Sequence, residues 1–247
     1  MFIFDRPMAT DTNFFLLLTA AAVAFVHTLA GPDHYLPFNA MARAFQWSRR
    51  KMVAVTLLCG VGHVLGSVGL ALIGIAAGAA IGSLQAIQSV RGQIAAWALL
   101  SFGLVYLAWG LRRASRHRPH AHIHVHADGV VHSHIHQHEG EHLHPHPSSD
   151  RAAARAGAWM MFTVFLLGPC EPLIPLLIIP AAQDQWPQVL LVTAVFAVVT
   201  LATMAAAVLL CDLGVRRIRP AGLERYSHAL AGAMVTLCAV GILALGL

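Results

Sequence analysis

Charged residues are scarce in this sequence. They make up 11% of its 247 residues, whereas hydrophobic residues make up 57% and the mean hydropathy is +0.67. A soluble domain carries roughly 25% charged residues, so the shortage excludes a soluble fold. Because each membrane-spanning helix needs about 20 apolar residues, the chain has room for about six or seven spans and little else. The sequence therefore predicts an all-α integral membrane protein whose main partner is the lipid bilayer.

Other patterns missing from the sequence limit the classes of function that it could have. No two cysteines have the CxxC spacing, which excludes a disulfide framework; the four are Cys59, Cys170, Cys211 and Cys238. No Walker A motif or other nucleotide-binding pattern is present, so any energy source must be an ion gradient or a partner. No basic start leads into an apolar core near residue 1, as it would in a cleavable signal peptide. We expect a protein that is not an enzyme and holds no permanent cofactor.

Six apolar segments are predicted to span the membrane. They cover residues 13–30 (continuing through a break to about 42), 52–80, 93–111, 156–182, 187–213 and 223–247. The fold class is thus six transmembrane helices, which divide into a first three-helix repeat at 1–112, a loop at 113–155 and a second three-helix repeat at 156–247. Three spans on each side of the loop enter from opposite sides, which predicts a 3+3 inverted repeat.

The net charge of +5 indicates orientation rather than nucleic-acid binding. Arginines and one lysine gather after the first, third and fifth spans, whereas the opposite side has only Arg6 and Arg91. Positive residues favour the cytoplasmic side. We therefore expect a multi-pass protein of a bacterial inner membrane, with both termini outside and the 113–155 loop in the cytoplasm.

Two matching interruptions break the first span of each half. The first reads GPDHYLP from Gly31 to Pro37, and the second reads GPCEPLIP from Gly168 to Pro175. Gly-Pro ends a helix, because glycine adopts unusual backbone angles easily and proline lacks an N–H. Paired breaks in corresponding helices point to a midplane binding site in transporters built from inverted repeats. The first and fourth helices are thus predicted to be broken at a shared site.

The breaks and their neighbours supply side chains that can bind a metal ion. At a rise of about 1.5 Å per residue, the histidines of the first two spans and the second break lie at comparable depth. Imidazole with carboxylate suits nickel or cobalt better than copper(I). A structural histidine at position 63 and a merely packed thiol at position 170 remain alternatives. The predicted transport site consists of His27, Asp33, His34, His63, Cys170 and Glu171.

These residues carry a resemblance to a known family. His27, a five-residue spacer and the Asp33-His34 pair resemble the signature of bacterial nickel/cobalt transporters, although the family's spacer has four residues. The Gly-Pro-Asp-His form, with the later Gly62-His63, is closer still to the urease-accessory-like and nickel-cobalt efflux branches. The resemblance implies movement of Ni²⁺ or Co²⁺ across the inner membrane, with His27, Asp33 and His34 as metal-site residues.

The loop between the repeats is rich in histidine. Residues 117–146 hold twelve of the sixteen histidines, mostly at alternate positions. A three-residue turn at 127–129 would form a β-hairpin over residues 120–136, with His124 opposite His132 and its histidines on one face. A two-residue turn, or a disordered tract, remains an alternative. The predicted metal-buffering or gating histidines are His120, His122, His124, His126, His132, His134, His136 and His138.

The leading hypothesis is transport of a divalent transition metal, with export of Ni²⁺ or Co²⁺ favoured and Zn²⁺ as a further cargo. Protons are the expected coupling ion, since protonation of the ligands would release the metal. One alternative is a thiol-disulfide electron carrier of the cytochrome-biogenesis type, although this needs a cysteine at each break and the first has Asp33. Another is an exporter of a small anion such as sulfite, which would bind at helix N-termini.

Overall fold

The computed structural model describes residues 7–78, 81–116, 120–125, 131–136, 147–168, 170, 172–217 and 224–245. Within these ranges the chain is almost entirely helical, and five helices are long and apolar enough to cross a membrane. The α-helices are α1 (Pro7–Ala30), α2 (Leu36–Ala44), α3 (Arg49–Ala76), α4 (Ile81–Arg116), α5 (Pro147–Leu167), α6 (Leu173–Ala182), α7 (Trp186–Arg217) and α8 (Ser227–Leu245). The predicted class of an all-α integral membrane protein is confirmed.

Both predicted helix breaks are present. In the first half α1 ends at Ala30, a 3-10 turn η1 (Pro32–His34) follows, and α2 restarts at Leu36. Pro32 has no N–H to continue the helical ladder, and the chain turns through hydrogen bonds from His34 N to Gly31 O (3.1 Å) and from Tyr35 N to Pro32 O (3.3 Å). In the second half α5 ends at Leu167 and α6 begins at Leu173. The fourth predicted span is therefore divided between the apolar end of α5 (Ala154–Leu167) and α6.

The third span differs most from its expected bounds. Helix α4 begins at Ile81, twelve residues before the predicted start at residue 93. Its first turns look polar in the sequence, yet Leu84 and Gln88 are fully buried and Arg91 is partly buried. The prediction that Arg91 lies in a connection between spans is wrong, because Arg91 is part of α4 and its partly buried guanidinium binds the backbone of neighbouring helices.

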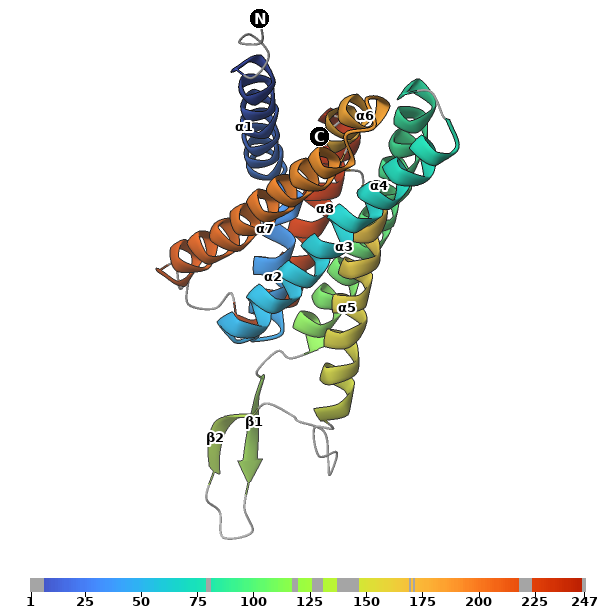
Figure 1. The fold of residues 1–247 in the computed structure, drawn as a ribbon. Helices are drawn as coiled ribbons and strands as arrows, with labels where there is room; N and C mark the ends of the chain where they lie inside the picture. The colour runs from blue at the N-terminus through green and yellow to red at the C-terminus, as the bar shows by residue number, and fades with distance from the viewer. Residues whose placement is uncertain are drawn as a thin grey trace, which may run out of the picture.

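Helices of the first half pack in pairs against helices of the second half. Figure 1 shows α1 beside α7 and α3 beside α5, while α4 runs antiparallel along α8. The first helix of each half thus packs on the second helix of the other half, and corresponding helices run in opposite directions. Small residues allow the α4–α8 approach, since a Cβ added at Gly232 would meet the Leu107 backbone nitrogen at 2.3 Å. This pairing is the one that a 3+3 inverted repeat would give, and the repeat itself stays a prediction.

Two hydrophobic clusters hold the bundle together. One joins α2, α3, α4, α5, α7 and α8 and contains Phe38, Leu99 and Met161. The other joins α1, α6 and α7, and it includes Leu177, Phe196 and the Cys170 thiol. Cys59 and Cys238 lie in the first cluster, as expected for cysteines that only fill space. The two helix breaks lie between these clusters, so the site has packed walls on both sides.

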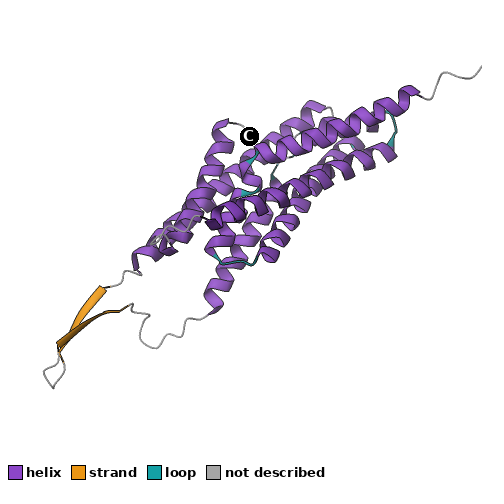
Figure 2. Cartoon of the chain, turned by 90° about the vertical axis from the view of Figure 1, so that its left-hand side faces the viewer, coloured by secondary structure: helices purple, strands orange, loops and turns teal. Residues whose placement is uncertain are grey.

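A β-hairpin extends from one end of the bundle (Figure 2). Strand β1 (His120–Val125) pairs antiparallel with β2 (Val131–His136), and the Cα register sets His124 opposite His132. This backbone register is the one that the three-residue turn predicts, although the turn itself lies outside the described residues. Figure 1 shows the hairpin at the same end of the molecule as the α2–α3 connection.

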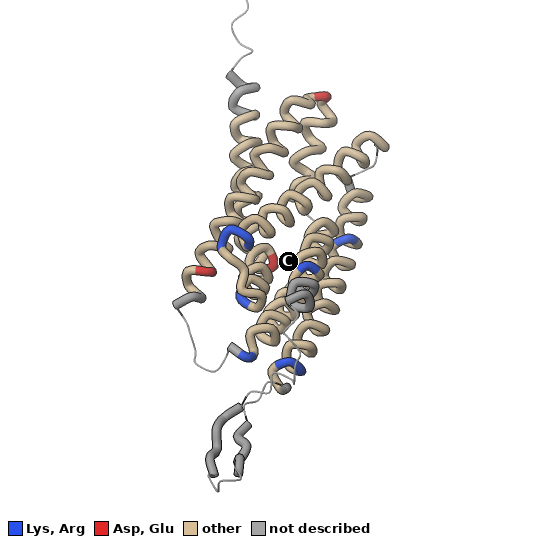
Figure 3. Tube along the Cα trace, turned by 90° about the horizontal axis from the view of Figure 1, so that it is seen from below, with Lys and Arg blue, Asp and Glu red and all other residues tan. Residues whose placement is uncertain are grey.

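Charge is sparse along the bundle, as Figure 3 shows. One ion pair joins the halves, from Arg49 Nε at the start of α3 to Asp212 Oδ2 near the end of α7, at 2.8 Å. His228, in the first turn of α8, is half-buried and its Nδ1 lies 2.7 Å from the Tyr106 hydroxyl. The antiparallel α4–α8 packing explains this contact, because it brings Tyr106 against the first turn of α8.

Candidate metal centre

Three histidines from the first half meet at the first helix break. His27 lies in the last full turn of α1, His34 ends η1, and His63 lies in the middle of α3. The ring centroids are 5.1 Å apart for His27 and His34, and 5.2 Å apart for His34 and His63. His34 and His63 are buried, with exposed fractions of 4% and 3%. Residues separated by up to 36 positions thus form one cluster because the Gly31-Pro32 break turns His34 back toward α3.

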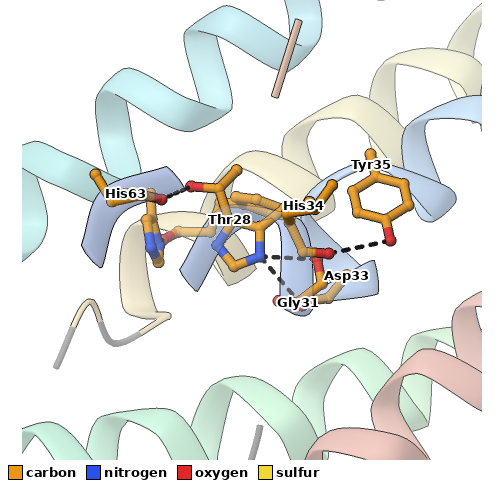
Figure 4. Close-up of polar contacts among 9 residues, drawn as sticks. Thr28, Gly31, Asp33, His34, Tyr35 and His63 are labelled. Carbon is orange, nitrogen blue, oxygen red and sulfur yellow. Dashed lines mark hydrogen bonds and ion pairs between the residues drawn. The ribbon is translucent and has the colours of Figure 1, made fainter. Parts of the chain in front are cut away.

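Two of the imidazoles are oriented through their Nδ1 atoms. His34 Nδ1 lies 3.1 Å from the Gly31 carbonyl oxygen and 3.2 Å from Asp33 Oδ1 (Figure 4). His63 Nδ1 lies 3.2 Å from the carbonyl oxygen of Phe165 on α5. Carbonyl and carboxylate oxygens only accept, so these contacts assign the ring proton to Nδ1 in both residues. Their Nε2 atoms then carry free lone pairs.

The Nε2 atoms of His27, His34 and His63 are buried and have no hydrogen-bond partner. A buried polar atom without a partner costs about 1–3 kcal/mol, so three in one cluster need an explanation. The second helix break adds the fully buried Cys170 thiol, and ligand atoms of His27, His63 and Cys170 all lie within 4.8 Å of one another. Ligands about 2.1 Å from a tetrahedral metal ion lie about 3.4 Å apart, a spacing reached by small rotamer changes. The donors therefore suit a transition-metal ion.

A cavity of about 310 Å³ adjoins the three histidines. Its other walls come from α4, from the end of α5 and from Ile242 on α8, so both repeats contribute. Asp33 is the one carboxylate among the described residues that line it. A polar cluster of this kind, enclosed by apolar helices, can replace the hydration shell of a cation at the middle of the membrane.

Comparison with known proteins identifies the family to which this chain belongs. The VIT family model matches residues 98–246, which is more than half of the chain and runs from inside α4 through α8. The chain belongs to the VIT family. This family consists of metal-ion transporters, so the expectation of a metal-ion transporter that is not an enzyme is confirmed at that level. No curated protein and no solved structure matches the chain.

The VIT family match leaves out α1 to α3, where the three histidines lie. It includes the second break, from which Cys170 comes. The site residues of the first half are thus supported by their own geometry, whereas the transport class is supported by the family match. The two observations are independent and agree.

The structure brings together most of the predicted site. His27, His34, His63 and Cys170 converge, and Asp33 lies beside His34 rather than among the free donors. Glu171 lies outside the described residues, so its place in the set stays a prediction. Of the loop histidines, His126 and His138 also lie outside them, and only the backbone of the other six is described.

Three residues at the site escape the sequence argument. Phe165 contributes its carbonyl oxygen, which any residue could supply, and its ring packs edge-on against the rings of His34 and His63, with centroids 6.0 Å apart in each pair. Ser67, one turn after His63, accepts a hydrogen bond from Cys170 N at 3.0 Å. Arg91 donates to the carbonyl oxygen of Leu166 at 2.9 Å. The sequence alone could have indicated the Arg91 contact, because an arginine close to an apolar span is rare enough to suggest a buried partner.

Proposed function

We propose that this VIT family member carries a divalent transition-metal ion through the cluster of His27, His34, His63 and Cys170. The observation that carries the proposal is the grouping of His27, His63 and Cys170, whose ligand atoms lie within 4.8 Å of one another, with the His34 ring packed against both histidines at the first helix break. One break belongs to each repeat, so relative motion of the repeats would open the site to one side of the membrane at a time. Asp33 orients His34 in this scheme, as carboxylates commonly do for ligating histidines.

Nickel or cobalt is the proposed cargo and export the proposed direction. Imidazole donors suit both metals, and a single thiol beside three imidazoles does not resemble the thiol-rich sites that select copper(I). Zn²⁺ and Fe²⁺ use similar donors, and the family includes iron transporters, so both are competing cargoes. The proposed location is a bacterial inner membrane with the histidine hairpin in the cytoplasm, where it would collect metal for export, and proton entry would drive release.

Transport in oriented membrane vesicles tests the proposal. Inverted vesicles with the wild-type protein should accumulate Ni²⁺ or Co²⁺ when a proton gradient is present, and Zn²⁺ and Fe²⁺ are measured beside them. We expect His34→Ala to lower the rate at least about tenfold, because a metal site loses that much when a ligand or its partner is removed. His228→Ala, a histidine far from the cluster, is the matched control. If none of the four metals moves in wild-type vesicles, the proposal is wrong.

The hairpin can be tested separately. Deletion of residues 119–147 should lower the metal tolerance of cells while leaving the initial rate at saturating metal within about twofold, since the midplane ligands are untouched. The measurement is growth across a nickel and cobalt series, together with vesicle transport by the same variant. Unchanged tolerance would exclude a buffering or gating role for the hairpin.

The two other functions lack support at the site. A thiol-disulfide carrier needs a second thiol at the first break, but all four cysteines are free and Asp33 lies there instead. An anion exporter needs donors that face the cavity, whereas the Nε2 atoms of His34 and His63, which we assign as unprotonated, are acceptors.

A further inference from the structure

Arg91 is a partly buried charged residue that has no role in the proposed transport mechanism. It lies near the start of α4, and its guanidinium contacts three helices. Nη2 donates to the carbonyl oxygen of Leu166 on α5 at 2.9 Å, and Nη1 lies 3.4 Å from the carbonyl oxygen of Gly66 on α3. Nη1 also donates to Oε1 of Gln88, one turn earlier on α4, at 2.8 Å. An arginine that binds backbone carbonyls at membrane depth is a functional candidate.

The contact with Leu166 follows from the helix break. Helix α5 ends at Leu167, and among its last carbonyls that of Val164 still accepts from Gly168 N at 2.8 Å, whereas those of Phe165 and Leu166 accept from the side chains of other helices. Unpaired carbonyls are costly in hydrocarbon, and the C-terminal end of a helix carries a partial negative charge. A guanidinium satisfies both needs because it is a planar cation with several donors. Arg91 therefore holds the open end of α5.

The adjoining carbonyl belongs to the metal site. Phe165 precedes Leu166, and its carbonyl oxygen accepts the hydrogen bond from His63 Nδ1. Arg91 and His63 thus bind consecutive carbonyls of the same helix end. The two carbonyls belong to consecutive planar peptide units that share the Leu166 Cα, so a displacement of the Leu166 carbonyl is passed to the Phe165 carbonyl through a single backbone atom.

Gly66 completes the clamp. It lies three residues after His63, on a nearby part of the α3 surface. A Cβ at position 66 would lie 2.6 Å from the Leu166 carbonyl oxygen and 3.1 Å from Arg91 Nη2. The close contact of α3, α4 and α5 at this point therefore depends on the absence of a side chain.

We propose that Arg91 is a positioning residue for the metal site. By binding the Leu166 carbonyl it keeps the Phe165 carbonyl on His63 Nδ1, which holds His63 in one tautomer with Nε2 directed to the cavity. The proposal rests on the proposed function for its metal readout, but the tautomer can be measured without metal. This positioning role is opposed to a purely electrostatic role of Arg91, in which its positive charge would weaken cation binding.

Co²⁺ binding to the purified full-length protein in lipid nanodiscs provides the first test. Arg91→Gln should weaken Co²⁺ binding about 10- to 100-fold and alter its visible absorption spectrum, as the loss of an outer partner does at other metal sites. Arg91→Lys keeps the charge but cannot span the same acceptors, so we expect an intermediate loss. Wild-type affinity and spectrum in Arg91→Gln, or tighter binding, would overturn the proposal.

A glycine pair separates position from charge. Gly66→Ala leaves Arg91 and its charge in place but pushes the Leu166 carbonyl away, so it should reproduce the loss seen in Arg91→Gln. Gly69→Ala, one turn further along α3, meets nothing within 4 Å and should match the wild type. If Gly66→Ala binds Co²⁺ as the wild type does while Arg91→Gln does not, the loss in Arg91→Gln does not come from displacement of the Leu166 carbonyl, and the proposal fails.

The ¹⁵N chemical shifts of His63 provide the second test, assigned by their loss in His63→Ala. In metal-free wild type they should report a proton on Nδ1, and in Arg91→Gln a mixture of both tautomers. An unchanged tautomer overturns the positioning role even if the protein binds no metal. Conversely, equal Co²⁺ binding by the wild type and His63→Ala would reject the proposed metal site but not the effect of Arg91 on the tautomer.

Discussion

In both His34 and His63, the two ring nitrogens have different surroundings. Each places Nδ1 against a backbone carbonyl and leaves Nε2 buried in the cluster. A structural role and a metal-binding role are therefore not alternatives for His63, because the first prepares the second. At His34 the additional contact with Asp33 places a negative charge next to the imidazole, which raises its strength as a ligand.

The thiol of Cys170 supplies a prediction at this scale. Cys170→Ser keeps the volume but replaces a soft donor by a hydroxyl, so the Co²⁺ complex should lose its sulfur-to-metal charge-transfer absorption and bind at least about tenfold more weakly. Visible and near-ultraviolet titration of the purified protein measures both. Cys59→Ser is the control, since Cys59 is equally buried but lies in the packing core. An unchanged spectrum in Cys170→Ser would show that the thiol is not a ligand.

At the scale of helices, the sequence predicts best those features that depend on neighbouring residues in the chain. Pro32 removes a donor from the helical ladder, so the break at Gly31 follows from two adjacent residues alone. The early start of α4 does not, because Gln88 and Arg91 become acceptable inside the bundle only when α5 ends beside them. The His63–Phe165 contact is likewise tertiary, since it joins residues 102 positions apart. The residues that converge at the breaks were thus predictable from the sequence, but the tertiary contacts that hold them were not.

The first break should be sensitive to a single methyl group. A Cβ added at Gly31 would lie 2.5 Å from His34 Nδ1 and 2.8 Å from Asp33 Oδ1, although its φ of −87° suits any residue. Gly31→Ala should therefore displace His34 and lower metal transport about tenfold, with a stability loss of about 1–3 kcal/mol from overpacking. Vesicle transport and thermal unfolding in detergent measure the two effects.

Gly241→Ala, on α8, meets nothing within 4 Å and is the control for a glycine substitution in a helix. If Gly31→Ala transports normally, the positions of His34 and Asp33 are not critical, and the first break serves only to end α1.

Over the whole molecule, the inverted repeat explains why the site is asymmetric in its ligands. The fold relates the two breaks, but the first supplies Asp33 and His34 whereas the second supplies Cys170 at the position that corresponds to Asp33. Related backbones therefore deliver different donors to one place. A cation held between them contacts both repeats, so its binding energy can favour one arrangement of the repeats over another.

The orientation of the bundle gives a prediction on the same scale. The α2–α3 and α6–α7 connections lie at opposite ends of the helices (Figure 1). The positive residues near Arg49 favour the cytoplasm for the first, which puts the second outside. In a Cys211→Ser background, a membrane-impermeant thiol reagent should label Gln185→Cys in intact cells but Arg50→Cys only after permeabilisation. Both positions are exposed, and the remaining three cysteines are buried. The reverse labelling pattern would place the histidine hairpin outside the cell, and the hairpin would then favour metal uptake over export.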